Sequence, residues 1–409
     1  MNQKIRQQFP SLARIHDKMP ITFLDGPAGV QVPSSVINAM GDYYKTSNAN
    51  AHGHFILTQE TDVVLESTRA KVATFLGAEG RHTISFGQNM TTLNFSLSRA
   101  IGRILKAGDE IVITQLDHES NRGPWLTLRD KGVIVREAKL KADGTLDYTD
   151  FANKINEKTR LVAMGWAANI FGTINDVVKI RKIAHEAGAW LLIDAVHYAP
   201  HLSIDVQAIG CDFLLCSAYK FYGPHVGLLY SKPGLLDRLQ PDRLRTAYQH
   251  APYSIETGTL NHAAIAGVKA SIEFIETFGE GETERDRLVD AMEEIHKHEI
   301  NLAKQLWNGL YTIKKIQLFG PPMNTAERAP TLSFLYKGKT ADEVGKFLGS
   351  KNVCTWSGHF YAIRATEVLG LSEKGGVTRM GISVYNTMED IERTLDLSLI
   401  HISEPTRPY

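Results

Sequence analysis

Blocks of apolar residues alternate with amphipathic stretches along this chain. Short, uninterrupted apolar runs suit strands that are buried on both faces, and such runs lie at 111–114, 161–168, 189–193 and 213–216. Helical periodicity predicts helices at 61–76 and 176–187. Strands that alternate with helices form parallel sheets covered by helices, so the pattern predicts an α/β fold with a mostly parallel sheet.

The pattern changes after residue 230. A long, charged, helical stretch from about 282 to 310 predicts a connector, and strand, helix and strand patterns follow it at 332–337, 341–350 and 353–356. A chain of 409 residues exceeds one average domain. We therefore expect an N-terminal segment at 1–20 that packs with the small domain, a large domain at 21–280 and a small C-terminal α+β domain at 281–396.

Composition narrows the possible partners. Lys and Arg total 45, as do Asp and Glu, so the formal charge is zero, which argues against nucleic acid or an anionic membrane as the main partner. The three cysteines have no C-x-x-C spacing, which disfavours a disulfide framework or a zinc site. No apolar stretch suits a secretory signal or a bilayer span. We expect a soluble, cytoplasmic protein without a metal.

A carboxylate and a lysine follow two neighbouring apolar runs. Asp194 ends the run at 189–193, and Lys220 follows the run at 213–216. Ligands of parallel sheets bind beyond the carboxyl ends of strands. Pyridoxal phosphate needs a lysine amine for its aldehyde and an acid that keeps its ring nitrogen protonated. Ser217 and Tyr219 add hydroxyl groups beside the lysine. Taken alone, Lys220 would be interpreted as a surface lysine and Asp194 as an aspartate in a turn. Together, the two residues favour a cofactor site.

The same stretch carries a family resemblance. IDAVHYAPH and CDFLLCSAYKFYGPHVGLLY resemble the pyridoxal-phosphate signature of class V aminotransferases, nearest to the cysteine-desulfurase-like branch. The likeness runs from LDGPAG at residue 24 to SVYNT at residue 383. It implies a fold type I enzyme with a seven-stranded, mostly parallel sheet, with pyridoxal 5'-phosphate as cofactor. It also implies a small amino-acid substrate and a homodimer with a shared active site.

The resemblance assigns further residues to the cofactor. A glycine turn that opens a helix offers N–H groups to a phosphate, and the matching positions here are Gln88, Asn89 and Met90. His118 matches the ring that stacks on the cofactor and joins Lys220 and Asp194 as a catalytic candidate. Asn169 matches a group near the ring hydroxyl, and His197 stands where desulfurases commonly carry glutamine.

Two more positions concern the partner subunit and the substrate. Thr259, in IETGTLNHAAI, matches the loop that reaches the cofactor phosphate of the neighbouring subunit; an ordinary turn is the alternative. Arg379 matches the arginine that binds the substrate carboxylate through a bidentate pair; a surface arginine is the alternative. Lys220 would move protons as general acid and base.

One loop departs from the family pattern. Desulfurases of this group carry a cysteine two residues after a Gly-His pair, whereas this chain has Gly358-His359-Phe360-Tyr361. A phenol cannot accept sulfur as a persulfide, so Tyr361 becomes a substrate-binding candidate. Cys354 is expected to be a buried structural cysteine. Three functions stay open: a desulfurase-like enzyme without the loop cysteine; an aminotransferase, epimerase or C–S/β-lyase; and a cofactor-binding protein without turnover.

The C-terminal residues break the pattern. An amphipathic helix is expected to end at Asp396, and LSLIHISEPTRPY at 397–409 neither continues its periodicity nor resembles the family's ending. The segment resembles the translation of a sequencing-library adapter joined to a shortened reading frame. We expect a non-native tail; a natural, divergent tail is the alternative.

Overall fold

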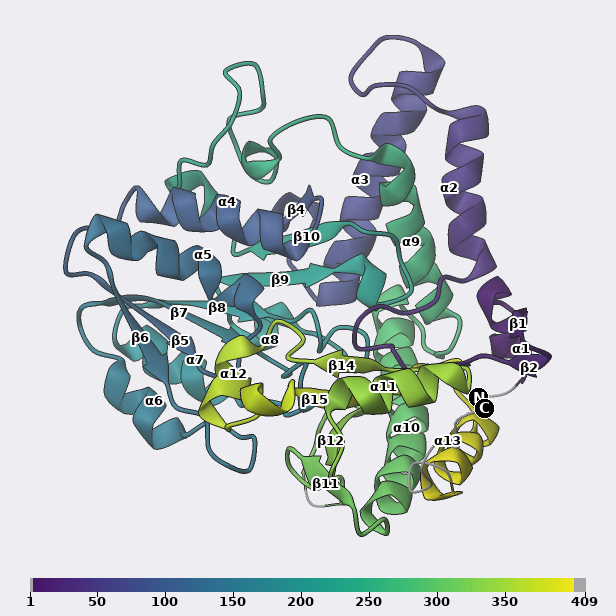
Figure 1. The fold of residues 1–409 in the computed structure, drawn as a ribbon. Coiled ribbons are helices and arrows are strands. Elements are labelled where there is room, and N and C mark those ends of the chain that lie inside the picture. The colour runs from purple at the N-terminus through teal and green to yellow at the C-terminus, as the bar shows by residue number, and fades with distance from the viewer. Residues whose placement is uncertain (1–2, 325, 401–409) are drawn as a thin grey trace.

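A seven-stranded sheet forms the centre of the computed structural model, which describes residues 3–324 and 326–400 (Figure 1). Its order is β4-β10-β9-β8-β7-β5-β6. The strands are β4 (Ile84–Gly87), β5 (Glu110–Thr114), β6 (Ile134–Ala138), β7 (Thr159–Gly165), β8 (Trp190–Asp194), β9 (Phe213–Ser217) and β10 (Gly227–Ser231). Only β10 runs antiparallel to its neighbours, β4 and β9. The predicted mostly parallel sheet is confirmed.

Helices cover both faces of this sheet (Figure 1). They are α2 (Ser34–Thr46), α3 (Ile56–Leu76), α4 (Met90–Gly102), α5 (Gly123–Leu126), α6 (Tyr148–Lys154), α7 (Val177–Glu186), α8 (Val206–Ile209) and α9 (His262–Glu276). Successive side chains of β5 enter different cores, because side chains alternate along a strand. Ile111 and Ile113 pack in the cluster that contains Leu97 of α4, whereas Val112 packs in the cluster that contains Ile180 of α7.

The long helix α10 (Glu284–Tyr311) joins two cores. A capping box at Thr283 begins it: Thr283 accepts the Asp286 N–H, and the Asp286 carboxylate accepts from Thr283 in return. Leu288 packs in the core of the large sheet, whereas Leu306 packs in a separate core under the C-terminal strands. This helix therefore contributes side chains to two separate cores, and its role as a connector between domains stays a prediction.

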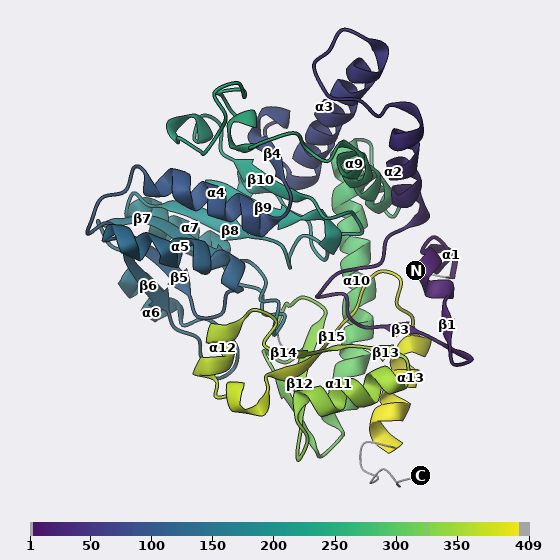
Figure 2. The same cartoon turned by 45° about the horizontal axis from the view of Figure 1, so that its top comes forward.

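The C-terminal part is built on a four-stranded antiparallel sheet of order β11-β12-β15-β14. Its elements are β11 (Ile316–Phe319), β12 (Thr331–Tyr336), α11 (Ala341–Ser350), β13 (Val353–Cys354), β14 (Trp356–Gly358), α12 (Ile363–Val368), β15 (Val377–Gly381) and α13 (Met388–Ile400). The single strand expected at 353–356 is two strands. β13 pairs with the N-terminal β3 (Thr22–Phe23), whereas β14 pairs with β15, so the chain changes sheets at Thr355 (Figure 2).

The C-terminal helix is longer than expected, and the N-terminal segment pairs with it. Helix α13 does not end at Asp396 but continues to Ile400, since Leu397 packs against the same core as Leu395. Residues 401–409 lie outside the described part of the chain, and the origin of the tail stays a prediction. At the other end are α1 (Gln3–Arg6), β1 (Ile15–His16) and β2 (Met19–Pro20). Arg6 forms a 2.9 Å ion pair with Asp390 of α13.

The N-terminal segment packs into the same core as Leu288. The Phe9 ring lies 5.0 Å from that of Tyr385 and 5.3 Å from that of Phe274 on α9. The division at residues 20 and 280 stays a prediction. Across residues 3–324 and 326–400, no helix combines the length and apolar composition that crossing a bilayer requires.

Candidate active site

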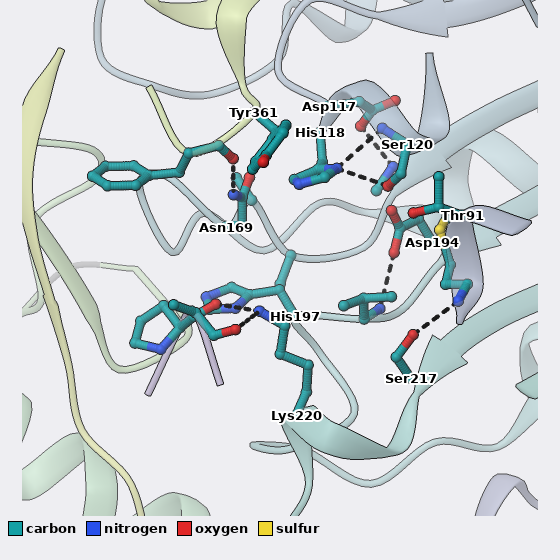
Figure 3. A pocket seen from close by; sticks show the side chains of 18 of the residues that line it. Thr91, Asp117, His118, Ser120, Asn169, Asp194, His197, Ser217, Lys220 and Tyr361 are labelled. Atoms are coloured by element: carbon teal, nitrogen blue, oxygen red, sulfur yellow. Dashed lines mark hydrogen bonds between the residues drawn. The ribbon is translucent and has the colours of Figure 1, made fainter. Parts of the chain in front are cut away.

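A cavity of about 880 Å³ opens where the carboxyl ends of β7, β8 and β9 meet the C-terminal sheet (Figure 3). The predicted residues that line it are Asn89, Met90, His118, Asn169, Asp194, His197, Ser217, Tyr219, Lys220, Tyr361 and Arg379. Gln88 and Thr259 do not line it, and both are exposed. The structure thus brings together residues that are as far apart in the sequence as Asn89 and Arg379.

Strand register explains why Asp194 and Lys220 meet. Asp194 is the last residue of β8 and pairs with Leu215 of β9. Two residues later β9 ends at Ser217, and a single 3-10 turn, Ala218–Lys220, follows. Both functional side chains therefore start at one edge of the sheet, as parallel strands require.

Lys220 is a buried amine with few polar partners. It is 8% exposed, and its Nζ donates to the carbonyl oxygens of Pro27 and of Ala28, the latter at 3.0 Å. Burial, with a smaller contribution from the positive charge of Arg379, lowers the pKa of the Lys220 ammonium to about 7, although the charge of Asp194 acts in the opposite direction. A lysine with such a pKa is partly neutral at pH 7 and can act as a nucleophile or a base.

Two buried carboxylates, those of Asp194 and Asp117, also line the cavity. Asp194 accepts the Val196 N–H at 2.9 Å, and burial raises its pKa to about 6. Asp117, which the sequence did not single out, accepts the Gly165 N–H at 2.7 Å. Burial raises the pKa of Asp117 to about 7, and the charge of Asp194 also raises it. The available signal was its position, immediately after the β5 strand end and before His118.

His118 is neutral and fixed in one tautomer. Its Nδ1 accepts the Ser120 N–H at 3.0 Å, so the ring proton is assigned to Nε2. Burial lowers the pKa of His118 to about 4, with further contributions from the charges of Lys220 and Arg379. The ring lies 5.2 Å from that of Tyr361 at an interplanar angle of 35°. A neutral, immobilised ring suits stacking.

Two buried polar atoms in the cavity wall have no partner among the described residues. The Nε2 of His197 pairs with Thr331 Oγ1 at 2.9 Å, but its Nδ1 has no partner. The Nδ2 of Asn169 donates to Phe360 O at 2.8 Å, but its Oδ1 has no partner. Buried polar groups are nearly always hydrogen-bonded, so these two atoms indicate a polar ligand and fit the ring substituents of pyridoxal phosphate.

Helix α4 begins at the edge of the same cavity. Asn89 caps it by accepting the Thr92 N–H at 2.9 Å, and the Met90 N–H donates to Ser217 Oγ at 3.0 Å. A Cβ at Gly227 would overlap backbone atoms of Asn89, so a glycine on β10 is what lets this turn approach the sheet. Helix N-termini attract anions, and this one fits a phosphate group.

Arg379 is a buried cation without a carboxylate partner. It lies on β15, is 3% exposed, and donates from Nη1 to Asn169 O at 2.9 Å. Its guanidinium lies 4.0 Å from the centre of the Phe360 ring. Burial lowers the pKa of Arg379 to about 9, and Asp25 opposes this effect without forming an ion pair in the described chain. Unpaired buried charges are costly, so this site favours an anionic ligand.

Further residues in the wall were not assigned a role from the sequence. They are Ser120, which bonds the His118 ring; His225, whose ring stacks on Tyr219 at 4.7 Å; and Trp356, which pairs with Arg379 across β14 and β15. Trp356 ends the strand expected at 353–356 and His225 lies between Gly223 and Gly227, but neither signal identified the residue as part of a site. Cys354 is half-buried rather than buried as expected, because it lies in the short strand β13; it does not line the cavity, and partial burial raises the pKa of its thiol to about 11.

Comparison with known proteins identifies the family. Residues 22–394 match the family model of class V aminotransferases. The chain belongs to the class V aminotransferase family. Its cofactor is pyridoxal phosphate, and the chain is a cysteine-desulfurase-like enzyme of this family.

The relatives of this class V chain match nearly its full length. A cysteine desulfurase of Serratia proteamaculans is 30% identical over 407 residues, which cover 96% of both chains. A probable cysteine desulfurase of Synechocystis sp. is 32% identical, covering 95% of this chain and 92% of the relative. The apo structure of a cysteine desulfurase from Thermococcus onnurineus has a TM-score of 0.87 at 27% identity, with 97% of each chain covered.

Proposed function

We propose that this class V chain binds an amino acid through its amino group and then releases or transfers a group from that amino acid. The reaction proceeds without a persulfide on a cysteine of the chain. The observation that carries the proposal is one cavity that holds Lys220, Asp194 and Arg379. Pyridoxal phosphate, when bound, supplies an electron-accepting ring. A desulfurase-like lyase and an aminotransferase or epimerase share this arrangement of residues.

Each residue has a role that follows from its surroundings. Asn89, Met90 and Ser217 would hold the phosphate, because they combine a helix N-terminus with a hydroxyl. Asp194 would pair with the ring nitrogen. Arg379 would bind the substrate carboxylate, because its buried charge lacks a carboxylate partner in the described chain.

Lys220 is proposed to move the protons. An acid–base group works best when its pKa lies near the working pH, and burial lowers the pKa of Lys220 to about 7. His118 would cover one face of the ring as a neutral group, since burial keeps its pKa low. His197 and Asn169 would meet the ring substituents with their unpaired atoms.

The absence of a thiol at residues 358–361 argues against persulfide formation there. The nearest cysteine in sequence, Cys354, lies in β13, away from the cavity lining, and its thiol pKa is raised to about 11 by burial. A nucleophile must lie close to the atom it attacks, because the rate advantage of proximity is lost with misplacement. Cysteine should therefore yield little sulfide and no persulfide on Cys354.

Cofactor attachment tests the core of the proposal. The purified protein should absorb visible light, and borohydride should fix the cofactor to the peptide that contains Lys220. Lys220→Ala should bind cofactor reversibly and lose turnover, while Lys232→Ala, which changes an exposed lysine in the same domain, should behave as wild type. A colourless protein that takes up no pyridoxal phosphate contradicts the assigned residues.

A product panel then separates the reaction types. Pyruvate, keto acids, racemised amino acid and sulfide distinguish lyase, transferase, epimerase and desulfurase. Rapid sulfide release from cysteine that Cys354→Ala abolishes would refute the thiol-free proposal. The same release retained in Cys354→Ala would support a lyase route.

The assembly and location are part of the proposal. Thr259 is exposed and does not line the cavity of its own subunit. This position suits a residue that reaches the cofactor phosphate in the neighbouring subunit. We therefore propose a cytoplasmic homodimer with a shared site. Sedimentation at micromolar concentration tests it, and a fully active monomer would rule out the shared site.

A further inference from the structure

The exposed end of the cavity carries aromatic side chains that the proposed chemistry does not use. Trp356 on β14, and Phe360 and Tyr361 in the loop after it, all line the cavity; we call these three residues the aromatic rim. Trp356 is 52% exposed and Tyr361 is 65% exposed. Apolar surface grouped at the mouth of a pocket is surface that a ligand can remove from water.

The rim begins beside the residue proposed to bind the substrate carboxylate. Trp356 and Arg379 are directly opposed in the antiparallel pair of β14 and β15. Opposed residues send their side chains to the same face of a sheet. The Phe360 ring lies 4.0 Å from the Arg379 guanidinium. An amino acid held at Arg379 therefore has two rings of the rim next to its binding point.

The loop is fixed in an unusual backbone conformation. Phe360 and Tyr361 have φ angles of 52° and 59°, which side-chain-bearing residues seldom adopt. Two hydrogen bonds from loops that follow β7 and β5 hold them: Asn169 Nδ2 donates to Phe360 O at 2.8 Å, and the Glu119 N–H donates to Tyr361 O at 2.7 Å. Strained backbone that is held in this way concentrates at ligand sites.

The rim continues into the wall that covers the cofactor. The Tyr361 ring lies 5.2 Å from the His118 ring, and both line one cavity (Figure 3). At about 880 Å³, the cavity lies in the upper part of the range of about 300–1,000 Å³ for small-molecule sites. It therefore has room for the cofactor together with a large substrate side chain.

We propose that the substrate is an α-amino acid with an aromatic or large apolar side chain, and that the aromatic rim binds this side chain. The inference rests on the proposed function, because it requires the carboxylate to lie at Arg379. It replaces the small amino acid expected from the sequence. It also gives Tyr361 a task that a thiol at this position could not perform: packing against a flat, apolar group.

A spectral titration of the cofactor-loaded protein tests this proposal. Phenylalanine, tryptophan, leucine, alanine and cysteine are each added, and the half-saturating concentration is read from the change in the visible band. Phenylalanine or tryptophan should bind at least about tenfold more tightly than alanine, since burial of a large side chain provides that much. Trp356→Ala and Tyr361→Ala should each reduce this ratio at least about fivefold, because ring stacking is lost.

Two controls accompany these variants. Trp356→Phe should keep most of the ratio, because it retains a ring. Tyr311→Ala, which removes an aromatic side chain that is 76% exposed at the end of α10, should leave the ratio unchanged.

The outcomes separate this proposal from the proposed function. If alanine perturbs the band but phenylalanine and tryptophan bind no better, the rim is not a side-chain site and the inference fails alone. The inference also fails alone if Trp356→Ala and Tyr361→Ala both keep the preference for phenylalanine or tryptophan over alanine. It fails in the same way if a second subunit covers the aromatic rim and keeps large amino acids out. If no amino acid perturbs the band of the loaded protein, the proposed action on amino acids fails, and this inference fails with it.

Discussion

The protonation of Lys220 is the property on which the proposed chemistry depends most directly. Burial lowers the pKa of this ammonium from 10.5 to about 7. The difference corresponds to about 5 kcal/mol against the charged form, at about 1.4 kcal/mol for each pKa unit. At pH 7, a substantial fraction of the amine is then neutral, about three orders of magnitude more than for an ordinary lysine with a pKa of 10.5.

Trace acetylation of the cofactor-free protein measures this directly. Only the neutral amine reacts, so the labelling rate of the Lys220 peptide, followed by mass spectrometry from pH 5.5 to 10.5, should rise with a midpoint near 7. Burial slows the absolute rate without moving the midpoint. Lys346 is the internal control, because the hydrogen bond to Asp342 raises the pKa of this exposed lysine, so its labelling should still be rising at pH 10.

Two variants should move the midpoint in opposite directions. Arg379→Gln removes a positive charge that disfavours the Lys220 ammonium, so the midpoint should rise. Asp194→Asn removes a negative charge that favours the ammonium, so the midpoint should fall. Both should stay well below 10.5, since burial is the largest cause. A wild-type midpoint above pH 9, or shifts of the same sign in both variants, would refute this account of the lysine.

Three further changes test other parts of the structure. Gly227→Ala should weaken cofactor binding at least about tenfold by equilibrium dialysis, because the added methyl overlaps Asn89 at the start of α4; unchanged affinity would show that this turn does not bind phosphate. Glu299→Ala should lower the free energy of unfolding in urea by about 2–4 kcal/mol, since it leaves His201 without its 2.7 Å buried partner; a loss under 1 kcal/mol would contradict this. Thr259→Ala should speed cofactor loss on dilution without changing the midpoint for Lys220 labelling, and unchanged retention would argue against contact with a partner's phosphate.

The sequence predicted the parts of the site that depend on local order. Asp194 and Lys220 follow apolar runs directly, so their placement at the sheet edge needs only the rule that parallel strands end together. The start of α4 follows a glycine turn, and His118 follows a strand. In each case the relevant geometry is set within a few residues of the functional group.

What the sequence missed depends on distant partners. The strand expected at 353–356 divides because Val353 pairs with Thr22 while Trp356 pairs with Arg379. Asp117 is a buried hydrogen-bond acceptor because Gly165 comes beside it. The helix end expected at Asp396 was wrong because packing of Leu397, rather than periodicity, extends α13. Thr259 requires a second subunit, so its role stays a prediction.

The LDGPAG turn shows how such long-range pairing creates the site. By its composition it is only a turn, yet it contacts both Lys220 and the strand that carries Arg379. Lys220 Nζ donates to the Ala28 carbonyl at 3.0 Å, and the Gly381 N–H, two residues after Arg379, donates to the Leu24 carbonyl at 2.8 Å. A Cβ at Gly381 would overlap Pro27. The turn therefore ties the lysine after β9 to the strand of the arginine in the C-terminal sheet, and under the proposed function the amine and the carboxylate of the substrate have to match the spacing that results.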